Sequence, residues 1–292
     1  MSHRDCLISG QIALLISIFF FSIMGISVKS LLDIPFYEIV FFRSIISFIL
    51  CICALKIQKI SCWGKHKKKL FCRGVTGTVS LVLYFLTLKT LPLSIAVALQ
   101  YISPVFIVFV SWLFLGEKPS KIQMISLFIA LGCVIWIQNI QAKELSVFVI
   151  FGIISAFFSA LSFPMIRSLN RSEHPLVIVF YFASVTLVTL GPYTFLHWRM
   201  PHLWEFARLC MLGVSAQLGQ YFLTIAYQRE KAPIIANLSY LNVVSAFIVG
   251  EFFWGEHLSL KEILGIFIII FCALISSGGW KNWRNYFNTR HF

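Results

Sequence analysis

Hydroxyl, phenol and amide side chains recur at helical spacing inside two otherwise apolar segments of this sequence. The segments 70–88 and 206–228 each carry four of them at intervals of three or four residues, which places them on one helix face. These residues are Thr76, Ser80, Tyr84 and Thr87 in the first segment, and Gln217, Tyr221, Thr224 and Gln228 in the second. Such groups could bind a polar molecule, but they also join neighbouring helices. We predict that Tyr84, Gln217 and Tyr221 line a cavity, whereas helix contacts are favoured for the hydroxyl groups.

A second polar set lies inside the segments 92–115 and 233–254. It consists of Gln100, Tyr101 and Ser103 in the first segment, and Asn237, Ser239, Tyr240 and Asn242 in the second. At a helical rise of about 1.5 Å per residue, Tyr101 lies roughly 13 Å from the start of its segment. Pro104 should kink the helix and free a backbone carbonyl near Gln100. Aromatic rings beside amides suit a ligand with a planar or amphipathic part, and the alternative role of the tyrosines is to stabilise a helix bundle.

Arg43 lies inside a third apolar segment, at 36–56. An arginine in such a place usually faces the interior of a helix bundle or a water-filled cavity. Glu38 and Glu251 are its candidate partners. Two interpretations stay open: Arg43 is a counter-charge for an anionic or carboxylate-bearing ligand, or it forms a structural ion pair or extends toward the membrane surface.

Membrane-spanning helices must position these side chains. The chain of 292 residues is 59% hydrophobic and only 12% charged, with 30 Phe, whereas a soluble domain is about 25% charged. A helix of about 20 apolar residues crosses a bilayer. Dividing the apolar blocks at charged residues, Gly and Pro predicts an all-α polytopic membrane protein. Its ten transmembrane helices are expected at 10–32, 36–56, 70–88, 92–115, 121–138, 147–167, 175–198, 206–228, 233–254 and 260–280.

Basic residues are distributed unevenly between the two sides of these spans. With both termini in the cytoplasm, seventeen of the 24 Lys and Arg residues, including Arg73 and Arg167, lie on the inner side. Six lie on the outer side, and Arg43 lies within a span. This satisfies the positive-inside rule and predicts a multi-pass protein of a bacterial inner membrane, with both termini cytoplasmic. The basic run 65–69 is therefore interpreted as an anchor on anionic lipid rather than as a nucleic-acid site.

The tetrapeptide Tyr-Phe-Leu-Thr occurs twice, at 84–87 and at 221–224. Further matches follow in the same order at a nearly constant offset: Leu99 and Tyr101 with Leu238 and Tyr240, Gly116-Glu117 with Gly255-Glu256, and Cys133 with Cys272. We therefore predict two five-helix repeats, at 8–140 and 147–280, and a cytoplasmic tail at 281–292. Because five is odd, the second repeat is inverted in the membrane, which is the arrangement of many secondary transporters.

One position differs between the two predicted repeats in a way that bears on energy coupling. Glu251 stands where the first repeat has Trp112. A carboxylate in one repeat only is a feature that a proton-coupled carrier could use, so Glu251 is a candidate coupling residue. The alternative is a structural or hydrated residue in an exchanger or uniporter. Glu117 and Glu256, in the paired Gly-Glu motifs, are interpreted as structural or gating residues.

Several motifs together resemble the EamA-type transporters of the drug/metabolite transporter superfamily. The first half contains Arg73-Gly74 to Tyr84-Phe85, Leu91-Pro92-Leu93, Ile102-Ser103-Pro104 and Leu115-Gly116-Glu117, and the second half contains Ala232-Pro233, Asn237-Leu238, Tyr240 and Gly255-Glu256 at the matching places. The resemblance covers about residues 8–280. It implies ten helices in two EamA repeats, a central cavity and alternating access. It implies no particular substrate, because members carry amino acids, nucleoside-like metabolites, sugars and drugs.

The sequence contains no His-Glu-x-x-His, Gly-x-Ser-x-Gly or P-loop motif, which disfavours a membrane enzyme and ATP hydrolysis. We therefore predict a carrier for a small-molecule substrate, without cofactor, metal or nucleic acid, and leave a homodimer open. A channel and a scaffold are the other classes considered.

The direction of transport is open between uptake, export and exchange. Abundant Ile, Phe and Lys are typical of the AT-rich genome of a host-dependent bacterium. This favours uptake or exchange of a metabolite such as an amino acid or S-adenosylmethionine. A multidrug or metabolite efflux carrier is the alternative.

Overall fold

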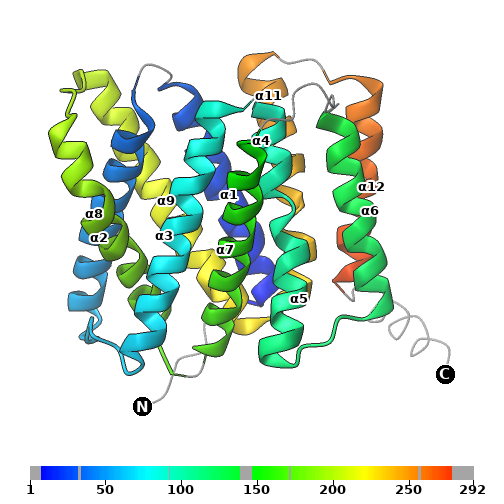
Figure 1. Cartoon of the computed structure of the whole chain (residues 1–292), viewed down its shortest axis with the longest axis horizontal. Helices are drawn as coiled ribbons and strands as arrows, with labels where there is room; N and C mark the ends of the chain where they lie inside the picture. Colours follow the sequence, from blue (N-terminus) through cyan, green and yellow to red (C-terminus); the bar gives the residue numbers. More distant parts are fainter. Residues whose placement is uncertain are drawn as a thin grey trace.

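The computed structural model describes residues 8–31, 34–91, 93–138, 147–170, 172–255 and 258–277, and this part of the chain is all-helical. Its helices pack side by side in a single bundle (Figure 1). They are α1 (Gly10–Lys29), α2 (Phe36–Ile57), α3 (Lys67–Thr90), α4 (Leu93–Gln100), α5 (Ser103–Leu115), α6 (Lys121–Gln138), α7 (Val149–Ser168), α8 (Pro175–Leu196), α9 (Leu203–Arg229), α10 (Ala232–Leu238), α11 (Leu241–Trp254) and α12 (Leu260–Ser276). The predicted tail 281–292 and Glu256 lie outside the described residues.

Two of the predicted spans are each divided into two helices. The span predicted at 92–115 consists of α4 and α5, and the span predicted at 233–254 consists of α10 and α11. Nine segments of the described chain have the length and hydropathy of membrane spans, and α12, in the last predicted span, has 17 residues. The prediction of an all-α multi-pass membrane protein is confirmed.

The second helix of each divided span ends on a glycine. Gly116 follows α5 with a φ of 67°, and Gly255 follows α11 with a φ of 63°. A Cβ atom disfavours this left-handed conformation, so glycine is the residue that most readily ends a helix in this way. The repeated Gly-Glu motif therefore marks two helix ends in corresponding places.

Helices from the two halves of the chain pack against one another in matching pairs. α1 lies against α9 as α3 lies against α7, and α2 contacts α9 as α8 contacts α3. α2 also packs on α8, and α6 on α12. The helix bounds correspond as well, because Gly10–Lys29 recurs as Val149–Ser168 and Phe36–Ile57 recurs as Pro175–Leu196. Both pairs are separated by 139 residues, the same offset that separates Tyr101 from Tyr240.

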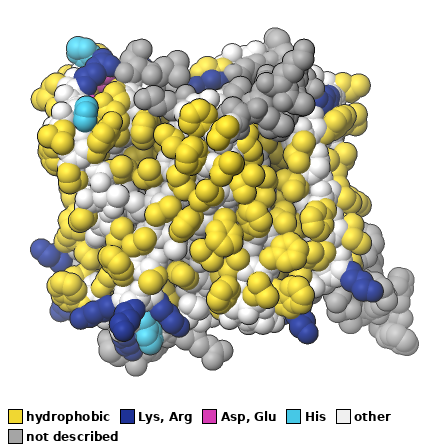
Figure 2. Space-filling model, viewed as in Figure 1, with side chains coloured by type: hydrophobic (Ala, Val, Ile, Leu, Met, Phe, Trp, Pro, Cys, Tyr) yellow, Lys and Arg dark blue, Asp and Glu magenta, His cyan; other side chains and the backbone are white. Residues whose placement is uncertain are grey.

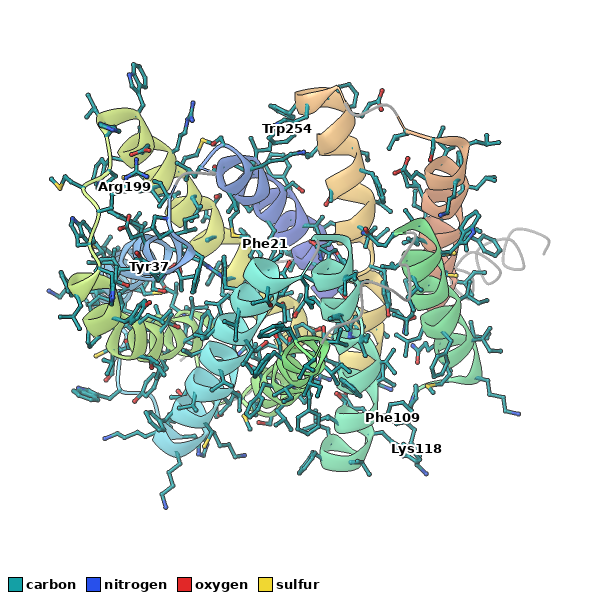
Figure 3. All side chains as sticks on the ribbon, turned by 45° about the horizontal axis from the view of Figure 1, so that its top comes forward. Phe21, Tyr37, Phe109, Lys118, Arg199 and Trp254 are labelled. Carbon is teal, nitrogen blue, oxygen red and sulfur yellow. The ribbon has the colours of Figure 1, made fainter. Side chains whose placement is uncertain are left out.

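On the face drawn in Figure 2, an apolar belt lies between two rims that carry the charged side chains. Phe109 on α5, labelled in Figure 3, is an exposed apolar side chain. Leu113 and Phe253 are exposed as well. The connection between α2 and α3, at the lower left of Figure 1, and the first turn of α3 carry the exposed lysines of the 65–69 run. Because the hydrocarbon core excludes charge, this surface is suited to a lipid bilayer.

The first and last described helices meet at one face of the bundle. The side-chain Nε2 of Gln11, at the start of α1, donates to the backbone oxygen of Ser277, just beyond α12, at 3.1 Å. The described chain therefore begins and ends on the same side, as an even number of spans requires.

Candidate functional site

The two divided spans meet at a pair of tyrosines. Tyr101 follows α4 and Tyr240 precedes α11, so each lies at the break in its span. Their rings stack with centroids 5.9 Å apart and planes at 24°. The hydroxyl group of Tyr240, which is fully buried, donates to the backbone oxygen of Tyr101 at 3.0 Å. The structure therefore brings these two predicted site residues into direct contact between the halves of the chain.

Only one of the two breaks has a proline as its cause. Pro104 lies in the first turn of α5, where its missing N–H and its ring prevent α4 from continuing. Val243 occupies the corresponding position of α11, and the span is still divided at Ser239 and Tyr240. The second break was missed by sequence reasoning because no local residue marks it.

A polar connection links the end of α4 to α3 and α7. The hydroxyl group of Ser155 donates to the backbone oxygen of Ser80 at 2.8 Å, and that of Ser80 donates to the backbone oxygen of Ser155 at 2.9 Å. The same Ser155 hydroxyl group lies 3.3 Å from Oε1 of Gln100. Ser80 thus joins helices, whereas Thr87 and Thr224 bond within their own helices, to the carbonyl oxygens of Tyr84 and Gln220.

The remaining predicted amide and phenol side chains differ in burial and in whether their polar atoms form hydrogen bonds. Asn237 is buried, and its Nδ2 donates to the backbone oxygen of Pro233 at 3.0 Å. Gln217 is buried too; its Nε2 donates to Sγ of Cys51 at 3.0 Å, but its Oε1 has no partner in the described part of the chain. Tyr84 and Tyr221 are half-buried.

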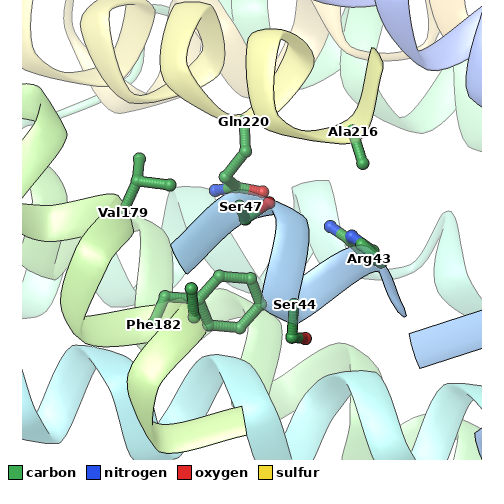
Figure 4. A pocket seen from close by; sticks show the side chains of 8 residues that line it. Arg43, Ser44, Ser47, Val179, Phe182, Ala216 and Gln220 are labelled. Carbon is green, nitrogen blue, oxygen red and sulfur yellow. The ribbon is translucent and has the colours of Figure 1, made fainter. Parts of the chain in front are cut away.

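Arg43 lines a pocket between α2, α8 and α9 (Figure 4). The pocket has about 10 Å³ of room, which suffices for about one water molecule. Its lining consists of Arg43, Ser44, Ser47, Val179, Phe182, Ala183, Ala216 and Gln220. Arg43 and Gln220 extend into this space from different helices (Figure 4). Gln220 was not singled out from the sequence, because it lies off the polar stripe of its helix.

The partners suggested for Arg43 are engaged elsewhere, so that part of the prediction was wrong. Oε1 of Glu38 accepts a hydrogen bond from the backbone N–H of Arg199 at 2.6 Å. Oε2 of Glu251 accepts one from the backbone N–H of Leu258 at 2.9 Å. Neither carboxylate forms an ion pair with Arg43 within the described ranges.

Arg73, which was counted among the basic residues of the inner side, lies on α3 inside the bundle. Its side chain is only 2% exposed. The guanidinium carbon lies 4.9 Å from the ring centroid of Phe182 on α8 and 5.9 Å from that of Phe163 on α7. The side chain is enclosed because α3 packs closely against both helices, and Gly77 on α3 leaves room beside it.

Arg167, which was counted among the basic residues of the inner side, belongs to a network with the first Gly-Glu motif. Its Nε lies 2.8 Å from Oε1 of Glu117, and its Nη1 donates to the backbone oxygen of Gln228 at 2.7 Å. The other carboxylate oxygen of Glu117 accepts a hydrogen bond from the backbone N–H of Ala232 at 2.8 Å. The network ties the end of α5 to α7, to the end of α9 and to the start of α10.

The sequence model of the EamA-like transporter family matches this chain twice, over residues 8–138 and 146–278. The pseudopaline exporter CntI of Pseudomonas aeruginosa is 33% identical over 276 residues, which cover 93% of this chain and 97% of the exporter. An uncharacterized transporter of Helicobacter pylori is 28% identical and covers 93% of this chain and 95% of its own. The human solute carrier family 35 member G1 is 26% identical, with 85% of this chain and 73% of the human protein covered.

A solved crystal structure has the same fold, with a TM-score of 0.81 and coverage of 92% of this chain and 96% of the other chain. At 16% sequence identity this likeness concerns the fold alone. The resemblance inferred from the paired motifs is confirmed by the match of the family model to almost the whole chain. This protein is therefore a multi-pass membrane transporter that belongs to the EamA-like transporter family.

Proposed function

We propose that this transporter is a secondary carrier that moves a small polar metabolite across a bacterial inner membrane by alternating access. The observation that carries the proposal is the contact between Tyr101 and Tyr240 at the breaks of two corresponding spans. Divided helices that meet between two structural repeats are typical of the substrate sites of secondary transporters. Motion of one half against the other would open this contact to either side.

The proposed motion requires two inverted repeats, at 8–140 and 147–280. Matching helix bounds and matching helix pairs support this division. Each repeat would contribute five spans, so the repeats would enter the membrane in opposite senses. The substrate would then lie between them, with Tyr84, Gln100, Tyr101, Gln217, Tyr221, Asn237, Tyr240 and Arg43 as the proposed substrate-binding residues.

The direction that we favour is export, because the relative with 33% identity is named as an exporter. Proteoliposomes containing the purified protein would be loaded with one unlabelled metabolite and mixed outside with the same labelled metabolite. The panel would include amino acids and S-adenosylmethionine, and protein-free liposomes would be the control. A carrier gives saturable uptake that internal substrate accelerates. Flux that rises linearly with the external metabolite concentration and does not depend on internal substrate would indicate a channel instead.

Proton coupling through Glu251 can be tested in the same vesicles. Its carboxylate accepts the backbone N–H of Leu258, which lies in the connection between α11 and α12, and this contact favours the structural role. We expect Glu251→Gln to retain both substrate exchange and any accumulation driven by a pH gradient. Loss of gradient-driven accumulation with exchange intact would instead identify Glu251 as a coupling residue.

A further inference from the structure

Two arginines inside the bundle have no carboxylate partner in the described part of the chain. Arg73 is almost fully buried, and its Nε and Nη1 atoms make no hydrogen bond there. Arg43 faces the pocket between α2, α8 and α9. The buried carboxylates bind other groups: Glu38 accepts the backbone N–H of Arg199, and Glu173 accepts those of Lys65 and His66 at 2.6 and 2.5 Å.

The two guanidinium groups approach the same region of the bundle. Phe182 lines the pocket together with Arg43, and its ring centroid lies 4.9 Å from the guanidinium carbon of Arg73. A Cβ atom at Gly77 would collide with Nη1 of Arg73, so a glycine at this position is what gives the guanidinium group its place.

Burying two positive charges in this way is energetically unfavourable unless an anion binds to them. A buried charge loses its hydration, and a second positive charge nearby adds repulsion in a medium of low polarity. The faces of Phe163 and Phe182 compensate Arg73 in part. Within the described ranges Arg43 has no such ring contact, and charged residues at membrane depth usually mark the path of a substrate or ion.

We propose that Arg43 and Arg73 together bind a carboxylate group of the transported molecule, so that the substrate class is a carboxylate-bearing, anionic metabolite. This inference rests on the proposed carrier function. A guanidinium group presents paired N–H donors that match a carboxylate. Gln220, Ser44 and Ser47 supply neutral polar groups around the same space.

The pocket is nearly closed, with about 10 Å³ of room, which suffices for about one water molecule. Pockets that enclose a whole small molecule usually measure about 300–1,000 Å³. The carboxylate group and the remainder of the substrate would therefore enter when the two halves of the protein move apart.

Thermal unfolding of the purified protein in detergent tests the proposal without knowledge of the natural substrate. The probes are malonate, succinate and glutarate, each compared with its neutral diamide at equal ionic strength. We expect at least one dicarboxylate to raise the unfolding midpoint in a saturable manner by a few degrees, and its diamide to leave the midpoint unchanged. Binding to the folded state alone raises the midpoint in this way.

Substitutions then assign the effect to the two arginines. Arg43→Gln and Arg73→Gln should each abolish the dicarboxylate-dependent rise, and Gly77→Ala should weaken it by displacing the guanidinium group of Arg73. Arg208→Gln, which removes an exposed arginine of α9, is the matched control and should keep the rise. Without ligand, Arg73→Gln should unfold at the same or a higher temperature than the wild type, whereas a purely structural arginine would lower it.

Three results would overturn the arginine site: no dicarboxylate stabilises the wild type, the diamides stabilise it equally, or the rise survives in both Arg43→Gln and Arg73→Gln. Inorganic phosphate is a further probe, and stabilisation by phosphate alone would replace the carboxylate with a phosphate-bearing substrate and so reject the proposed class. The transport assay is independent of this binding test. Arginine-dependent binding without any exchange of metabolites would contradict the carrier proposal only.

Discussion

At the scale of single residues, the hydroxyl group of Tyr240 replaces a hydrogen bond that the broken helix cannot make. A backbone carbonyl in the interior of a membrane protein needs a partner, because water and lipid do not supply one there. The break after α4 interrupts the regular helical bonding, and the oxygen of Tyr101 receives its bond from Tyr240 across the two halves of the chain. One side chain thus connects the two divided spans.

We expect Tyr240→Phe to lower the free energy of unfolding by about 0.5–1.5 kcal/mol, because it removes this hydrogen bond but keeps an aromatic ring in the stack. Unfolding in mixed detergent micelles with increasing denaturing detergent would measure the change. Tyr227→Phe is the matched control, since Tyr227 is also buried in a ring stack, on Phe163 at 4.7 Å. Its hydroxyl group forms no hydrogen bond with the part of the chain that the structure describes, so this variant should be nearly neutral. Equal effects of the two substitutions would contradict the assignment.

At the scale of helices, buried carboxylates hold the connections that precede α3 and α9. Glu173, just before α8, accepts the backbone N–H groups of Lys65 and His66, which lead into α3. Glu38, in the first turn of α2, accepts the backbone N–H of Arg199, which leads into α9. The two contacts occupy similar places in the two halves of the chain. Charge-assisted hydrogen bonds to backbone N–H groups are stronger than neutral ones, so these carboxylates fix where α3 and α9 begin.

The ion pair between Glu117 and Arg167 belongs to this scale too, because it ties α5 to α7 and to the start of α10. A double-mutant cycle with Glu117→Gln and Arg167→Gln should give a coupling energy in the range of about 0.5–3 kcal/mol. Unfolding of the wild type, the two single variants and the double variant would measure it. The more exposed pair of Arg199 and Glu205, at 3.6 Å, is the control and should couple weakly. Additive effects at Glu117 and Arg167 would show that the pair does not hold these helices together.

At the scale of the whole molecule, the two ends of the described chain lie on one face, and the rim of the apolar belt on that side carries the exposed 65–69 lysines (Figures 1 and 2). Positive residues near membrane spans remain preferentially in the cytoplasm. We therefore propose that this face is cytoplasmic.

A reporter that is active only in the cytoplasm should be active when fused after Phe292. The same reporter inserted between α6 and α7, within residues 139–146, should be inactive, because that connection is expected on the outer side. Activity measured in intact cells distinguishes the two placements. The reverse pattern would invert the proposed orientation, and equal activity of both fusions would contradict the number of spans.

The sequence by itself determined the spans. The span predicted at 121–138 is α6 (Lys121–Gln138), and the others agree with the described helices to within a few residues at each end. This succeeded because a backbone inside a bilayer must satisfy its own hydrogen bonds, so an apolar block of sufficient length becomes a helix whatever its neighbours are. The break near Tyr101 was also predictable, since Pro104 removes a backbone donor locally.

Only the tertiary structure decided the surroundings of the polar side chains. Arg73 follows a lysine run and has the local sequence of a surface anchor, yet the packing of α3 against α7 and α8 encloses it. Arg43 was recognisable as an unusual residue, but its lack of a carboxylate partner among the described residues depends on where Glu38 and Glu251 bind. The second break, at Ser239 and Tyr240, has no proline and depends on contacts across the bundle. The physical reason is common to all three: burial and pairing are set by residues far away in the chain, whereas helix formation in a membrane is set by residues nearby.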